Sequence, residues 1–222
     1  MPLAIEVQAQ PLEPEQAVAL LEEAGLMDAD TFYAQSADLR AVAFTLSRVH
    51  NAATMGRIKR ALERMMAEGG TIADFAEWLE TDGVTWSAWY TEVVYRNAVH
   101  GSYMRARWQQ MNETHIRREF PILVYDGIGD DRQTDLCRDL DGRWWWREDF
   151  PTHLYPPNHH QCRSIVRMMT KARADRLPPD RQATGAPDGL TPAEGWDANP
   201  ATDWQQMLER RQKVLEAFLD AA

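Results

Sequence analysis

The first half of the chain repeats apolar residues at the three- and four-residue spacing of amphipathic helices. The stripes that predict helices cover residues 14–21, 39–49, 55–66 and 72–79. Gly25 and the pair Gly69-Gly70 are suited to end the first and third of these helices. Thr71 is a suitable N-cap for the fourth helix, because its hydroxyl can accept a bond from a backbone N–H of the first turn.

A longer helix is predicted from about Trp86 to about Arg118 and would form the backbone of the fold. Its buried stripe is expected to comprise Trp86, Trp89, Val93, Met104, Trp108 and Met111. A second face carries polar and aromatic residues at positions i, i+4, i+7 and i+11, namely Arg96, His100, Tyr103 and Arg107. We expect this face to pack against the following β-containing module, with Arg96 held by a carboxylate from the segment 130–141.

After Pro121 the pattern changes to short β-like runs separated by turns. Residues 122–125 predict a strand, the Gly-rich stretch 126–130 a bend, and residues 134–140 a short helix. Residues 143–147 predict a second strand, with Trp145 on one face and Trp144 and Trp146 on the other. We expect residues 161–167 to form the strand that pairs with it.

The sequence therefore predicts an α+β fold. A predominantly helical N-terminal part with a long central helix packs on a small C-terminal β-containing module, followed by a linker and a C-terminal amphipathic helix. The expected divisions are an N-terminal helical segment (1–38), a central domain (39–172, helical over 39–120 and β-containing over 121–172) and a tail (173–222). The tail combines a proline-rich linker or extended strap with a helix that begins at Asn199-Pro200.

Composition narrows the class of protein. The 222 residues carry 24 Lys+Arg against 34 Asp+Glu, a net charge of -10, which argues against a protein that coats nucleic acid over its whole surface. Residues 91–176 nevertheless hold 14 basic and 12 acidic residues, a weak indication of a polyanion-facing surface. No run resembles a membrane span or a secretory signal, so we expect synthesis in a reducing cytoplasm and no membrane partner.

Only one cluster of residues has the character of a metal site. Its members are Cys137, His153, His159, His160 and Cys162. Two thiolates and one or two imidazoles could bind zinc, with Cys137, His159 and Cys162 as the candidate ligands. The alternatives are two buried thiols beside loop histidines, or a disulfide. In each case we expect the two cysteines to lie close together.

The chain shows no motif that requires an enzyme. The acidic residues between Asp126 and Asp141 alternate with Gly and Arg around a turn, which favours a solvated loop with local arginine pairing over a two-metal nuclease site. Walker A, GxSxG, HExxH and GxGxxG patterns are absent from the sequence. We therefore predict a non-enzymatic protein that needs no cofactor, apart from the zinc considered above.

Four ordered segments of the chain resemble the phage Mu F-like family of minor head proteins, also called phage head morphogenesis proteins. They are "AFT" at 43–45 with 67–75, "YRN" at 95–97 through Trp108, "DDR" at 130–132 through Gly142, and "YPPNH" at 155–159 through Arg163. The residues that match the family's motifs are Arg96, Tyr103, Arg107, Asp130, Arg132, Gly142, Pro157, Cys162 and Arg163. Ser164 replaces the second cysteine of the family's "CRC", which weakens any zinc site carried over.

The resemblance implies a structural protein of a tailed bacteriophage or prophage that acts in head morphogenesis near the portal. It also implies a place in the virion head interior, contact with portal, capsid or procapsid components, weak contact with packaged DNA, and a role in DNA packaging or ejection. One competing hypothesis is a zinc-assisted hydrolase or nuclease that uses Cys137, His159 and Cys162 with an acidic residue such as Asp131. Another is a DNA-binding module that uses the arginines of the middle segment.

Overall fold

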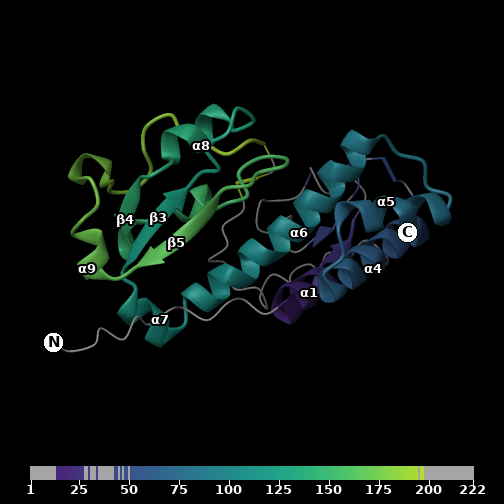
Figure 1. Ribbon diagram of the computed structural model, residues 1–222, viewed down its shortest axis with the longest axis horizontal. Helices are drawn as coiled ribbons and strands as arrows, with labels where there is room; N and C mark the ends of the chain where they lie inside the picture. The colour runs from purple at the N-terminus through teal and green to yellow at the C-terminus, as the bar shows by residue number, and fades with distance from the viewer. Residues whose placement is uncertain are drawn as a thin grey trace.

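The computed structural model describes residues 14–27, 30, 34, 43–44, 46, 48–49, 51–194 and 196–197. The helix predicted from Asn199 lies outside these residues. The described chain has an α+β fold, in which a group of helices lies on one side and a three-stranded sheet on the other (Figure 1). Among the described residues, no helix combines the length and the apolar character needed to cross a membrane.

The helical side contains five helices and a short two-stranded pairing within the described residues. The helices are α1 (Pro14–Glu23), α4 (Ala52–Glu68), α5 (Ile72–Thr81), α6 (Ala88–Met111) and α7 (Thr114–Glu119). Strand β1 (Gly25–Leu26) pairs in parallel with β2 (Ala43–Phe44). These bounds confirm the predicted helices over 14–21, 55–66 and 72–79.

Local capping explains why α4 and α5 begin and end as predicted. Asn51 accepts a hydrogen bond from the Thr54 backbone N–H, and Gly69 ends α4 in the left-handed conformation at φ 72°. Thr71 and Asp74 form a capping box at the start of α5, each accepting a bond from the other's backbone N–H.

The helix predicted over residues 39–49 is wrong for the part that the structure describes. Ala43 and Phe44 form strand β2, and the chain turns at Arg48. Leu46 and Val49 are nevertheless buried among the helices. The backbone of Ala43–Phe44 therefore pairs with Gly25–Leu26 and does not form a helix. The apolar spacing correctly indicated that Leu46 and Val49 are buried, but not which secondary structure they belong to.

The central helix is shorter than predicted, and of the six residues in its predicted stripe Val93, Met104, Trp108 and Met111 are buried and Trp86 is partly buried. The helix ends at Met111, where Asn112 Nδ2 donates to the Trp108 carbonyl, and α7 continues the chain as a separate turn. Trp89, predicted to be buried, is 62% exposed. In the first turn of α6 it is Tyr90 that enters the helical core in place of Trp89.

The sheet consists of β4 (Trp144–Trp146), β3 (Ile122–Asp126) and β5 (Ile165–Met169), in the order β4-β3-β5 and antiparallel throughout. Helix α8 (Asp135–Leu140), capped by Thr134, lies between β3 and β4 in the sequence. Strand β3 is central because it pairs with both other strands, and its first four residues are all buried, as expected of a strand covered on both faces.

Two details of the predicted sheet are corrected. The Trp-rich strand pairs with β3 and not with the segment 161–167, and β5 begins only at Ile165. Residues 159–162 form a turn in which Gln161 has φ 58°, and the Cys162 N–H donates to the His159 carbonyl. This turn, which directs Cys162 inward, is incompatible with an extended strand at the same positions.

Helix α6 contributes side chains to both main hydrophobic cores. Tyr90, Val94 and Ala106 belong to the core shared with α1, α4 and α5. Met104, Trp108 and Met111 belong to a second core with Trp145 and other residues of the sheet module. Figure 1 shows α6 running between the helices and the sheet.

The segment after β5 packs as a strap along the edge of the sheet. Helix α9 (Lys171–Ala174) is followed by a 3-10 turn (Pro179–Arg181), and Gln182 forms a bridge with Trp144. Trp144 Nε1 donates to the Pro178 carbonyl and Trp145 Nε1 to the Gly185 carbonyl. Of the two predicted forms, linker or extended strap, the described residues adopt the strap.

The buried guanidinium of Arg147 predicts a large effect on stability. It donates to the carbonyls of Met111 (3.0 Å) and Phe120 (2.7 Å), joining the end of β4 to the segment that links α6 with β3. Arg147→Ala should lower the free energy of unfolding by ~2–4 kcal/mol, since it leaves these carbonyls without donors. Guanidinium denaturation followed by circular dichroism measures this, and the exposed Arg118→Ala should change it by less than ~0.5 kcal/mol. Equal effects of both variants would contradict the prediction.

Candidate metal centre

Two cysteines and one histidine meet at the base of α8. Cys137 lies on α8, where the Thr134 hydroxyl caps its N–H, and Cys162 follows the turn that begins at His159. Both cysteines are buried and free. The Cys137 and Cys162 Sγ atoms lie 4.0 Å apart, and His159 Nε2 lies 3.2 Å from Cys137 Sγ. The expectation that the two cysteines are close together is therefore confirmed.

The orientation of His159 leaves Nε2 facing the thiols. Its Nδ1–H donates to the His160 carbonyl oxygen at 2.8 Å, so the neutral ring carries its lone pair on Nε2. The Cys137 hydrogen bond raises the pKa of His159, against the effect of partial burial. In many metal sites a hydrogen bond from the ring nitrogen that does not bind the metal fixes the orientation and the tautomer of the histidine in this way.

The environment of Cys137 favours a thiolate. Asn158 Nδ2 donates to the Tyr125 hydroxyl at 3.0 Å, so the phenol proton is directed to Cys137 Sγ at 3.2 Å. Hydrogen bonds with Cys162, His159, Ser164 and Tyr125 together lower the pKa of Cys137, and His159 donates to the thiolate when its ring is protonated on both nitrogens. The pKa of Cys162 is raised, because its proton is shared with Cys137 and both sit away from solvent.

These residues fit a zinc ion by donor type and by spacing. Ligand atoms of Cys137, His159 and Cys162 all lie within 4.8 Å of one another. A tetrahedral zinc with Zn–S of ~2.3 Å and Zn–N of ~2.0–2.1 Å holds its ligand atoms ~3.5–3.8 Å apart. Only small shifts separate the observed contacts from that geometry. The buried Ser164, which occupies the position of the family's second cysteine, hydrogen-bonds to Cys137.

The other two histidines of the predicted cluster point elsewhere. His160 Nδ1 is 2.9 Å from Asn97 Nδ2 of α6, and its ring meets that of Trp196 edge to face. His153 lies in a 3-10 turn and is not among the close ligand atoms. No carboxylate belongs to the group in the described part of the chain, so Asp131 is not positioned beside the thiols as the nuclease hypothesis requires.

Three residues at the site were not predicted from the sequence to belong to it. Tyr125 and Asn158 provide the hydroxyl and amide behind Cys137, and both are buried. His100 Nε2–H donates to the Ser164 carbonyl at 3.0 Å, and burial lowers the pKa of His100. A polar side chain in the otherwise apolar run 122–125 was the available signal for Tyr125. For His100 the sequence indicated the correct face of α6 but not its acceptor.

Arg96 does not take its predicted partner. It donates to Glu92 one turn earlier on α6, at 2.7 Å, and Glu92 also lies 3.5 Å from Arg132 Nη2. The expected carboxylate from 130–141 is thus replaced by an arginine from that segment, and Glu92 joins the two cations. A neighbour at i−4 reaches Arg96 at little conformational cost, which explains the difference. The polar face of α6 meets the sheet module at His100, whereas Tyr103 packs on the helical core and Arg107 bonds to Gln110.

The remaining motif residues shape the loops around the cluster. Asp130 accepts two bonds from Arg163, at 2.5 and 2.8 Å, and so fastens the bend after β3 to the residue next to Cys162. Gly142 has φ 74° and its N–H donates to the Tyr125 carbonyl. Pro157 follows a cis peptide bond in the loop that leads to His159. Of the local arginine pairing predicted for the acidic loop, the structure shows Asp135 with Arg138, whereas Asp126 pairs with the distant Arg167 of β5.

The Asp130–Arg163 pair predicts a pH-dependent contribution to stability. Its hydrogen bonds to Arg163 hold the Asp130 pKa below the usual 3.8, so the stabilisation is complete above that value and is lost as the pH falls through it and below. Asp130→Asn should therefore lower the melting temperature at neutral pH, and the difference from wild type should shrink towards about pH 3. Asp135→Asn, which removes an exposed pair, should have little effect at any pH. A difference that persists at low pH would argue against this assignment.

Comparison with known proteins supports the resemblance to the phage Mu F-like family that was inferred from the sequence motifs. A model of the family described as "Phage Mu protein F like protein" matches residues 56–167, just over half of the chain. A curated protein of Escherichia phage Mu, named "Putative capsid assembly protein F", is 26% identical over 189 residues, which is 75% of this chain and 42% of that protein. The chain thus spans less than half of that relative's length. No solved structure matches. On the extent of the family match, the chain belongs to the Phage Mu protein F like family.

Proposed function

We propose that this protein is a structural component of a tailed-phage head and acts in head morphogenesis. One observation carries the proposal: the family match runs from α4 to β5 and so includes both sides of α6 and the cysteine–histidine cluster. The name of the phage Mu relative refers to capsid assembly, which supports the same role. A match over 56–167 covers elements of both the helical side and the sheet module, and so is more specific than a match to one short motif.

The finer proposal is a position near the portal, inside the head, with the protein made in the host cytoplasm and carried in the virion. Any contact with packaged DNA would be weak, because the arginines of the middle segment are largely engaged. Arg96 and Arg132 share Glu92, Arg163 holds Asp130, and Arg147 is buried. Paired or buried arginines release few counterions from a phosphate backbone, which disfavours the DNA-binding hypothesis.

The cysteine–histidine cluster is proposed as a zinc site with a structural role in the sheet module. Zinc bound by Cys137, His159 and Cys162 would join α8 to the loop before β5 and so fix the position of both on the sheet. A structural role also accords with the lack of a neighbouring carboxylate in the described residues. We accordingly propose no hydrolytic activity.

The zinc proposal predicts metal content and a specific gain on substitution. Protein made in zinc-supplemented medium should contain about one zinc per chain by mass spectrometry, and Cys162→Ala should lose it. Ser164→Cys should bind zinc on the order of tenfold more tightly in competition with a chelator, since it supplies a fourth strong ligand. Ser164→Ala is the matched control and should retain zinc. Wild type and Ser164→Cys both free of zinc would leave the cluster as a hydrogen-bonded thiol–imidazole group.

The head role predicts where the protein is found and what its loss causes. Mass spectrometry of purified heads from the phage or prophage that encodes it should detect the chain at low copy relative to the major capsid protein. Deletion of its gene should reduce complete, DNA-filled heads by orders of magnitude in electron micrographs, and the wild-type gene supplied in trans should restore them. Cross-linking in proheads tests the portal as neighbour. Normal infectious particles from the deletion strain would contradict the proposed role.

A further inference from the structure

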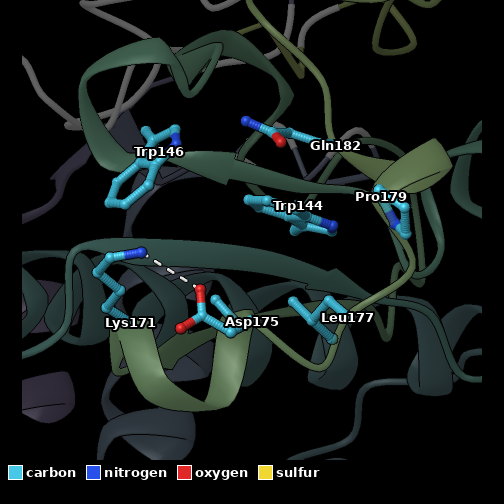
Figure 2. A pocket seen from close by; sticks show the side chains of 8 residues that line it. Trp144, Trp146, Lys171, Asp175, Leu177, Pro179 and Gln182 are labelled. Atoms are coloured by element: carbon cyan, nitrogen blue, oxygen red, sulfur yellow. Dashed lines mark hydrogen bonds and ion pairs between the residues drawn. The ribbon is translucent and has the colours of Figure 1, made fainter.

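The face of the sheet turned away from α6 carries a groove of about 200 Å³. Trp144 and Trp146 project from this face of β4, and α9 with the following Leu177 lies opposite them (Figure 2). Residue pairing places both tryptophans on the opposite face from Trp145, which belongs to the core against α6. The groove is therefore separate from the candidate metal centre.

The floor of the groove is apolar and its size suits one large side chain. Trp144 and Ala174 are buried with Ile122 and Val124 in a small third cluster, against which Trp146 and Leu177 pack while partly exposed. Cavities that take small molecules usually span ~300–1,000 Å³, so this volume fits a single anchoring residue of a larger partner better.

The chain segment that forms one wall of the groove is basic in an acidic protein. Residues 165–182 carry five Lys or Arg and two Asp, although the whole chain has a net charge of -10. Lys171 lies over the Trp146 ring at 5.6 Å and pairs with Asp175. Arg176 and Arg181 are exposed beside the lining residues and form no ion pair with any other described residue.

The strap holds the groove open in advance. The Trp144 indole N–H is fixed by the Pro178 carbonyl at 3.0 Å, and the Ala183 N–H donates to the Trp144 carbonyl at 2.9 Å. Because these bonds already fix Trp144 relative to the strap, binding of a partner would cost little conformational entropy at the groove.

We propose that this groove docks an acidic peptide segment of a partner protein. One large apolar side chain would lie between the two tryptophans and Leu177, and carboxylates would face Lys171, Arg176 and Arg181. A nucleic acid fits less well, because the carboxylate of Asp175 lines the recess together with the apolar side chains of Trp144, Trp146 and Leu177. The inference does not depend on the proposed head role, since it concerns binding by the purified protein.

Fluorescence anisotropy with the full chain tests this surface. The probe is a fluorescein-labelled peptide of sequence EDEDWLDEDE, compared with EDEDSSDEDE and with a labelled DNA duplex of about 20 base pairs. The first peptide should bind in the micromolar range, as expected of a small transient interface, and more tightly than either comparison probe. Arg176→Glu/Arg181→Glu should weaken its binding on the order of tenfold.

Matched variants separate this site from general effects. Arg60→Glu/Arg64→Glu makes the same charge change on exposed positions of α4 and should alter binding by no more than about twofold. Trp146→Ala should weaken binding on the order of tenfold, whereas Trp89→Ala removes an exposed tryptophan of α6 and should not. Thermal melts verify that each variant folds. If Trp146→Ala does not fold, the comparison of the two arginine double variants still tests the proposal. The proposal would be overturned if the first peptide did not bind, or if the serine peptide bound equally well. It would also be overturned if both arginine double variants weakened binding equally, or if the DNA duplex bound the groove more tightly than the peptide.

Discussion

Helix α6 is the constraint on which the rest of the structure depends, because two hydrophobic cores share it. Val94 and Ala106 face the helical core, and Trp108 and Met111 face the sheet module. With 24 residues at ~1.5 Å rise per residue, α6 is a rigid bar that sets the separation of the two sides. Its shared burial also explains why it shows no single apolar stripe. The family match covers residues 56–167 and so includes elements of both the helical side and the sheet module, as expected if the two sides depend on α6.

The sheet module is too small to be held by apolar burial alone. Its strands have three to five residues, and short sheets need packing or cross-links for independent stability. Polar links supply them: Arg147 reaches the end of α6, Asp130 binds Arg163, and Tyr125 connects Asn158 to Cys137. These links join segments that are distant in sequence, as a metal or disulfide staple does in other small domains. The cluster of Cys137, His159 and Cys162 lies where several of them meet.

Sequence reasoning succeeded where the cause of a structure is local. The caps at Thr71 and Gly69, the helix after Thr134 and the alternation of the three tryptophans depend on neighbouring residues, and all are observed. It failed where distant pairing decides, as in the order of the strands and the strand at Ala43–Phe44. Arg96 illustrates the limit in the site. Its face was evident and its partner is the local neighbour Glu92, but the second contact of Glu92 with Arg132 depends on tertiary packing, which the sequence does not encode locally.

The distribution of charge in three dimensions differs from its distribution along the chain. The arginines of residues 91–176 suggest a basic middle segment, but most of those near α6 and the metal centre face carboxylates. Pairing cancels their field beyond about a Debye length. Among the exposed arginines that form no ion pair with a described residue, Arg176 and Arg181 lie on the strap at the outer face of the sheet. A surface that attracts acidic groups therefore lies on the face of the sheet turned away from α6, and it combines cations from the end of the arginine-rich segment, Lys171 and Arg176, with Arg181 beyond it.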